Sequence, residues 1–141
     1  MEHTGNKQNR ILPILILAVS VFLTAGVKVI FSACGMHDDG TYGSCHWAEQ
    51  AVMAAGIIVA FQALMLVAGK AAAVQKALSF TVLVSAVVTA FLPGAWIRLC
   101  MMPSMACRAS MAPWTWGCCA CIAVLSLINL IINLRKKREE R

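Results

Sequence analysis

Charged side chains are scarce in this chain. Asp, Glu, Lys and Arg together make up 13% of its 141 residues, whereas hydrophobic residues make up 60%. Soluble globular chains carry about 25% charged and roughly 45–50% apolar residues. So few charges cannot cover the surface of a soluble domain, and so many apolar residues exclude a disordered chain. The composition therefore predicts a protein that is embedded in a membrane.

Motifs of soluble enzymes are also missing. The chain has no phosphate-binding loop, no nucleophile elbow and no paired carboxylates at catalytic spacing. No Asp, Glu or His lies in the middle of an apolar run, which argues against a proton-coupled carrier. A channel would need several copies of the chain, because four helices enclose only a narrow interior. We therefore expect a chain without an enzymatic activity or a cofactor.

Four apolar runs are long enough to cross a bilayer, which takes about 20 helical residues. They cover residues 11–33, 48–69, 77–98 and 113–134. No alternation of apolar and polar residues, the pattern typical of strands, competes with them. We predict an all-α membrane protein, a four-transmembrane-helix bundle that forms a single membrane domain over residues 1–141. Two cysteine-bearing loops, residues 34–47 and 99–112, connect its helices.

Basic residues gather on one side of this arrangement. Four spans place both termini and the short turn 70–76 on the same side. That side holds nine of the twelve basic residues: Lys7, Arg10, Lys70, Lys76, Arg135, Lys136, Lys137, Arg138 and Arg141. The positive-inside rule then places both termini and the tail 135–141 in the cytoplasm, and both loops outside the plasma membrane. Because these charges flank apolar runs, we expect the lipid bilayer as their partner, and no nucleic acid.

One alternative concerns the first span. Phe31-Ser32-Ala33-Cys34 resembles the small-residue box that precedes a lipid-modified cysteine, and cleavage there would leave three spans. Lys28, however, interrupts the run where a signal peptide is most apolar, and the run is longer than a usual signal core. We therefore favour four spans, and the intact mass of the mature chain distinguishes the two readings.

Gln62, Asn129 and Asn133 are amides that fall within the apolar runs. Asn129 and Asn133 are four residues apart, so they share one face of a helix. An amide in hydrocarbon needs a hydrogen-bond partner, and this face therefore points into the bundle or toward another subunit. We take all three amides as candidate interaction residues.

Two further patterns predict contacts between helices. Gly56 and Ala60 form a small-xxx-small pair, which allows two helices to approach closely. Glu49 opens the second span at the depth at which Lys28 closes the first. Similar depth predicts an ion pair between these two side chains.

Four of the seven cysteines bracket the predicted outer loops. Cys34 and Cys45 lie at the ends of the first loop, and Cys100 and Cys107 lie in the second. Outside the cytoplasm cysteines tend to oxidise, and four cysteines allow three pairings. Pairing within each loop is the simplest, whereas cross-pairing would tie the two loops together. We predict structural disulfides among these four residues and leave the connectivity open.

Redox exchange or soft-metal binding is the alternative role for the outer side. Its candidate metal ligands are Met36, His37, His46, Met101, Met102 and Met105. Thioethers, thiolates and imidazoles suit Cu(I), although oxidation of the loop cysteines would remove the thiolates. Cys118, Cys119 and Cys121 fall in the fourth run, where a cysteine packs as a small hydrophobe, and their role is left open.

Several short sequence elements lie between the predicted spans or at their ends, and one lies within the fourth span. They are Cys34, then Cys45-His46-Trp47 opening a span, then Cys100-Met101-Met102-Pro103-Ser104-Met105-Ala106-Cys107-Arg108, then Pro113 and Asn129-Leu130-Ile131. In these elements the chain resembles the small prokaryotic membrane proteins of domain-of-unknown-function family 4418, over roughly residues 11–134. The resemblance implies a four-helix fold with a cysteine-rich outer cap. It also implies an accessory role, because members of that family are often encoded beside exporter-type ABC transporters.

These observations favour one function over the others. We expect a small non-enzymatic integral membrane protein, an accessory or interaction subunit of a larger membrane complex, with another membrane protein or a second copy as its partner. The alternative is a membrane protein that handles thiols and disulfides, or Cu(I), on the outer side.

Overall fold

Four long helices make up most of the chain. The structure is a computed structural model, and it describes residues 2–30, 38–99, 101–102 and 104–139. The helices are α1 (Glu2–Val29), α2 (Ser44–Ala68), α3 (Ala72–Phe91) and α4 (Ala112–Glu139), and a short π-helix, η1 (Cys107–Met111), leads into α4. The described residues contain no β-strand beyond one isolated bridge.

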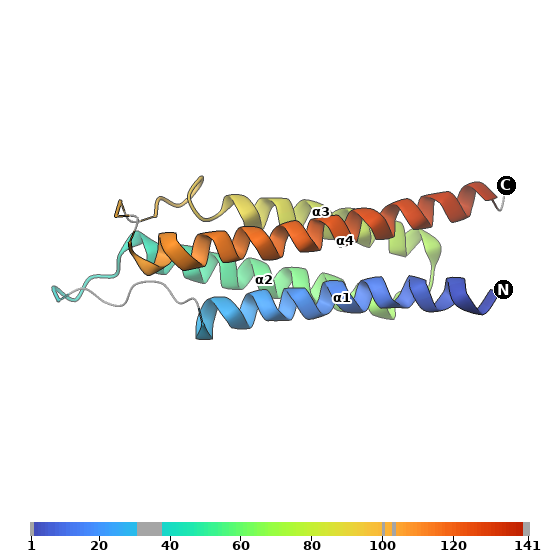
Figure 1. Cartoon of the computed structure of the whole chain (residues 1–141), viewed down its shortest axis with the longest axis horizontal. Coiled ribbons are helices and arrows are strands. Elements are labelled where there is room, and N and C mark those ends of the chain that lie inside the picture. Colours follow the sequence, from blue (N-terminus) through green and yellow to red (C-terminus); the bar gives the residue numbers. More distant parts are fainter. Residues whose placement is uncertain (1, 31–37, 100, 103, 140–141) are drawn as a thin grey trace.

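The helices lie side by side along one long axis (Figure 1). α1 packs against α2 and α4, and α3 packs against α4 and α2. Both termini and the α2–α3 turn lie at one end, which we call the terminal end. The opposite end holds residues 38–43 and the segment between α3 and η1, and we call it the loop end.

Each of the four helices is long and apolar enough to cross a membrane, which confirms a multi-pass bundle. Within the apolar stretch of each helix, only 22–33% of the residues are buried inside the chain. Most of the apolar surface therefore faces outward. Such a surface is unfavourable in water and favourable in hydrocarbon, because apolar area gains free energy on leaving water.

The third helix begins and ends earlier than its predicted range, 77–98. It begins at Ala72 and ends at Phe91. Pro93 and Gly94 follow, and Gly94 has a φ of +97°, a conformation that glycine adopts without strain. The Gly94 amide donates a hydrogen bond to the Ile97 carbonyl at 3.0 Å, so the chain turns where a longer helix was expected.

The predicted close contact at Gly56 is confirmed between α1 and α2. A Cβ added at Gly56 would lie 2.6 Å from Thr24 Oγ1. That hydroxyl donates to the Ser20 carbonyl one turn earlier at 2.9 Å, which fixes it against α2. The approach of the two helices therefore favours glycine at this position.

Candidate functional site

Two cysteines from distant parts of the chain meet at the loop end. Cys45 lies in the first turn of α2, and Cys107 is the first residue of η1. Their Sγ atoms are 3.1 Å apart although the residues are separated by 62 positions. Cys45 is 1% exposed and Cys107 is 0% exposed. The structure thus brings together one candidate disulfide residue from each predicted loop.

Backbone and hydroxyl contacts hold the two cysteines in place. Ser44 Oγ donates to the Arg98 carbonyl at 2.9 Å, which ties the start of α2 to the segment after α3. The amides of Arg108 and Ala109 both donate to the Met105 carbonyl, at 3.0 and 2.9 Å. These bonds fix the turn that presents Cys107 to α2.

Buried apolar residues follow each of the two cysteines in the sequence. Ala48, one turn after Cys45, is fully buried, and so is Met111 at the end of η1. Both belong to the main hydrophobic core. The two sulfurs are buried at the loop end, where a protein thiol or a reductant has little access.

Two chemical states are open to this pair. A disulfide requires an S–S distance of about 2.05 Å, and among the described residues no two sulfurs lie that close. The 3.1 Å contact brings the atoms within a small displacement of bonding. Cys34 and Cys100 lie outside the described residues, so the predicted pairing within each loop stays a prediction.

The predicted ion pair beside this site is confirmed. Lys28 Nζ, near the end of α1, lies 3.3 Å from Glu49 Oε1 on α2. The Glu49 side chain is 6% exposed and the Lys28 side chain is 55% exposed. A buried carboxylate thus meets a cation that reaches it from the surface, and the contact joins the loop ends of α1 and α2.

The candidate metal ligands are spread over the loop end. Met101 is 93% exposed and Met102 is 62% exposed. The His46 ring stacks on the Tyr42 ring with centroids 4.3 Å apart. Met36 and His37 lie outside the described residues. Within the part of the chain that the structure describes, no three His, Cys, Asp or Glu residues form a group suited to a metal ion. Copper binding stays a prediction.

The candidate interaction residues of α4 face the interior. Asn129 is fully buried, and its Nδ2 donates to Ser79 Oγ on α3 at 2.8 Å. Asn133 is 9% exposed, and its Nδ2 donates to the Asn129 carbonyl at 2.8 Å. Of the two orientations that the sequence allowed, the structure shows the one inside the bundle. A role of these amides in binding a partner stays a prediction.

Ser79 accepts the hydrogen bond from Asn129, and the sequence did not predict this partner. Its hydroxyl also donates to the Gln75 carbonyl at 2.7 Å, so it both gives and receives a hydrogen bond. Gln62 on α2 is only partly buried, yet its Oε1 atom is buried and has no hydrogen-bond partner among the described residues. The three amides therefore differ: two are satisfied between or within helices, and one is not.

The remaining cysteines of α4 divide between core and surface. Cys118 and Cys119 are 8% and 2% exposed and belong to the hydrophobic core, as expected of small apolar side chains. Cys121 is exposed. It lies on the surface of α4 that faces away from the bundle, together with Gly117 and Ala120.

The sequence of the chain matches the model of one protein family. No curated protein and no solved structure matches the chain. The family model described as "Domain of unknown function (DUF4418)" matches residues 14–132, a range that includes α2, α3, parts of α1 and α4, and the Cys45–Cys107 contact. The chain belongs to this family, as the elements between its spans predicted.

Proposed function

We propose that this chain is a non-enzymatic accessory or interaction subunit of a larger membrane complex, with a cap at its loop end that a Cys45–Cys107 disulfide closes. The observation that carries the proposal is the 3.1 Å contact between two buried sulfurs that come from separate segments. A cap fixed in this way presents a constant outer surface to a partner. The partner class that the family resemblance implies is an exporter-type ABC transporter.

Burial of the sulfurs supports a structural role for the pair. An exchange disulfide must expose one sulfur to the attacking thiolate, and neither Cys45 nor Cys107 does so. In the chain-entropy model, a disulfide that closes a loop of this length stabilises the fold by about 4 kcal/mol. That gain comes from the cross-link itself and needs no redox cycle.

The proposed orientation follows from charge and from redox chemistry together. Arg10, Lys70, Lys76 and Lys136 lie at the terminal end, which the positive-inside rule assigns to the cytoplasm. The sulfur pair lies at the opposite end, which then faces the oxidising side of the membrane, where disulfides persist. Both arguments support a cytoplasmic position of the termini and an extracytoplasmic position of the cap.

We assign the partner to the surface of α4 that faces away from the bundle. Gly117, Ala120 and Cys121 are exposed there, and a Cβ added at Gly117 would meet no atom of the described chain within 4 Å. Packing within the chain therefore gives no reason for glycine at this position. Small residues on a membrane helix allow the backbone of another helix to approach closely.

Cross-linking through Cys121 tests the association directly. Mild oxidation of membranes that contain the full chain should yield a disulfide-linked species through Cys121, either a homodimer or a complex with one partner. Cys121→Ser should abolish this species, and Gly117→Leu should reduce it by displacing the approaching helix. Cys119→Ser is the control, because Cys119 is buried and should not affect the yield. If only monomer forms under all conditions, the surface that we assign is wrong.

The second candidate function is thiol–disulfide or Cu(I) handling at the same two cysteines. The observation in its favour is that their sulfurs touch without being bonded to each other. Alkylation in intact cells distinguishes the two: a cycling pair gives a mixture of labelled and unlabelled chains, whereas a structural disulfide stays unlabelled. Copper at one equivalent after purification would support the metal-handling role.

A further inference from the structure

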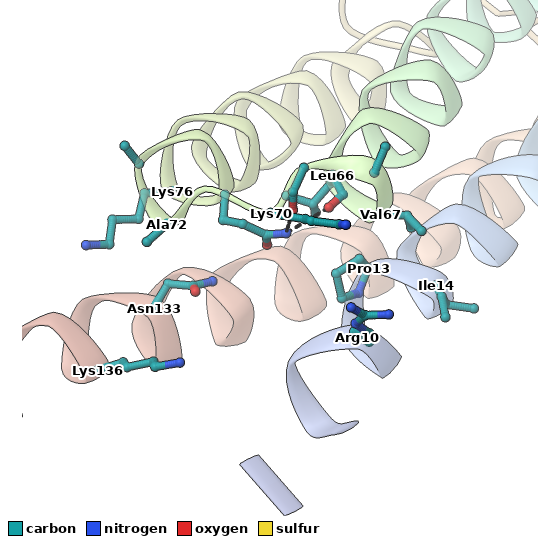
Figure 2. Close-up of a pocket in the computed structure, with 14 residues that line it drawn as sticks. Arg10, Pro13, Ile14, Leu66, Val67, Lys70, Ala72, Lys76, Asn133 and Lys136 are labelled. Atoms are coloured by element: carbon teal, nitrogen blue, oxygen red, sulfur yellow. Dashed lines mark hydrogen bonds between the residues drawn. The ribbon is translucent and has the colours of Figure 1, made fainter. Parts of the chain in front are cut away.

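A large cavity opens at the terminal end, far from the cysteine pair. It has a volume of about 1000 Å³ and lies between α1, the α2–α3 turn, the start of α3 and the end of α4. Figure 2 shows its lining side chains around one opening. Volumes of about 300–1,000 Å³ are typical of sites that hold a small organic ligand.

Four cations line this cavity, each from a different segment. They are Arg10 of α1, Lys70 of the α2–α3 turn, Lys76 of α3 and Lys136 of α4. No described acidic side chain lines the cavity, and none of the four cations forms an ion pair with a described residue. Basic residues at this end are expected from the topology alone, but their convergence on one cavity is not. The cavity is therefore suited to an anion.

The backbone around the cavity also favours an anion. Ala72 and Ala73, the first residues of α3, line the cavity, and no side chain caps this helix start. The first amides of a helix and its dipole favour negative charge. The carbonyls at the end of α2 would repel an anion, but Gln75 Nε2 donates to two of them, Leu66 O at 2.9 Å and Gly69 O at 2.6 Å.

The wall of the cavity is apolar on the side that runs along α1 and α2. Pro13 and Ile14 of α1 and Leu66 and Val67 of α2 contribute this wall, as Figure 2 shows. Since α1 and α2 are long and apolar enough to cross a membrane, this side leads toward the hydrocarbon. A ligand that matches both parts has a phosphate group for the cations and an alkyl chain for the wall.

We propose that this cavity binds the headgroup of an anionic phospholipid, with the phosphate among Arg10, Lys70 and Lys136 and the first part of an acyl chain along Ile14 and Val67. Basic recesses between membrane helices are suited to such headgroups. The bound lipid would fasten the terminal ends of three helices to one molecule. The inference is independent of the role of the cysteine pair.

Native mass spectrometry of the full chain in a mild non-ionic detergent tests the proposal. The probes are dioleoylphosphatidylglycerol, dioleoylphosphatidylcholine and soluble glycerol 3-phosphate. We expect one phosphatidylglycerol to bind about tenfold or more tightly than phosphatidylcholine, since each Lys or Arg near the surface adds appreciably to binding of an anionic lipid. Glycerol 3-phosphate should bind more weakly than phosphatidylglycerol, because it lacks the acyl chains.

A pair of double variants with equal charge supplies the control. Lys70→Gln with Lys136→Gln should weaken phosphatidylglycerol binding about tenfold or more. Arg135→Gln with Arg138→Gln removes the same charge from exposed residues of α4 that do not line the cavity, and should leave binding nearly unchanged. Circular dichroism checks that each variant is folded, and if the double variant is not, Lys136→Gln alone should show a smaller loss.

Three results would overturn the proposal. Equal losses in both double variants would show diffuse attraction without a site. Equal affinity for phosphatidylcholine and phosphatidylglycerol would exclude recognition of the anionic headgroup. Binding of glycerol 3-phosphate as tight as that of phosphatidylglycerol would assign the cavity to a soluble phosphate compound.

Discussion

Asn129 of α4 donates a 2.8 Å hydrogen bond to Ser79 of α3, and both side chains are fully buried between the two helices. In hydrocarbon neither group can turn to water instead, so the bond joins the helices at a defined register. It is a buried polar contact that links these two helices through side chains alone.

Removal of this bond should destabilise the bundle. Asn129→Leu and Ser79→Ala should each lower the free energy of unfolding, and a double-mutant cycle should give a coupling of about 0.6–1.7 kcal/mol, as for other hydrogen bonds between membrane helices. Unfolding by an ionic detergent, followed by circular dichroism, measures it. Thr81→Val is the control, because Thr81 is exposed and bonds only to its own helix. A coupling near zero would contradict the contact.

Two glycines should respond in opposite ways to alanine. Gly56→Ala should destabilise the chain by about 1–3 kcal/mol, because the new Cβ would press on Thr24 Oγ1. Gly117→Ala should be neutral or stabilising by up to about 1 kcal/mol, because alanine favours helix and meets open space. The same unfolding assay compares them. Adding Thr24→Ala to Gly56→Ala should recover part of the loss, and an equal response at both glycines would argue against the close approach of α1 and α2.

Gln62 should be replaceable by an apolar residue. Its buried Oε1 atom has no hydrogen-bond partner among the described residues, and such an atom costs about 1–3 kcal/mol. Gln62→Met, of similar volume, should therefore raise the free energy of unfolding of the purified chain. If stability falls instead, Gln62 has a partner in the folded protein, and its role as an interaction residue gains support.

Loss of either partner of the Lys28–Glu49 ion pair should lower stability by a different amount. Loss of the cation in Lys28→Met leaves a buried carboxylate, whereas Glu49→Gln leaves an ammonium group that water can reach. We expect Lys28→Met to cost about 1 kcal/mol or more and Glu49→Gln to cost less, since pairs with one exposed partner are worth little by themselves. Thermal unfolding of the two variants in detergent ranks them. The reverse order would show that the carboxylate is stabilised mainly by other contacts.

The sequence predicted those features of the fold that depend on local composition and depth. Apolar runs gave the four spans, the shared depth of Lys28 and Glu49 gave their ion pair, and the small residue at Gly56 gave a close contact. Each was expected from the composition, depth or residue size of individual helices, without knowledge of how all four helices pack. The early end of α3 was also marked in the sequence, by Pro93 and Gly94, but the apolar residues beyond them concealed it.

The features that the sequence did not reveal depend on which helices are neighbours. Ser79 is one of several small polar residues in apolar runs, and only the packing of α3 on α4 makes it the partner of Asn129. In the same way, nothing in the spacing of Cys45 and Cys107 favours their meeting over pairing within each loop. Only the arrangement of α2 and η1 at the loop end brings the two sulfurs together.

Disulfide mapping of the chain, purified after thiols are blocked in the cell, tests the central claim most directly. Cyanogen bromide cleaves after each methionine, so it separates all four loop cysteines: Cys45 falls in fragment 37–53 and Cys107 in fragment 106–111. The account predicts that mass spectrometry finds these two fragments joined, and that reduction releases them. Blocked thiols on both cysteines, or Cys45 joined to Cys34 and Cys107 to Cys100, would contradict it.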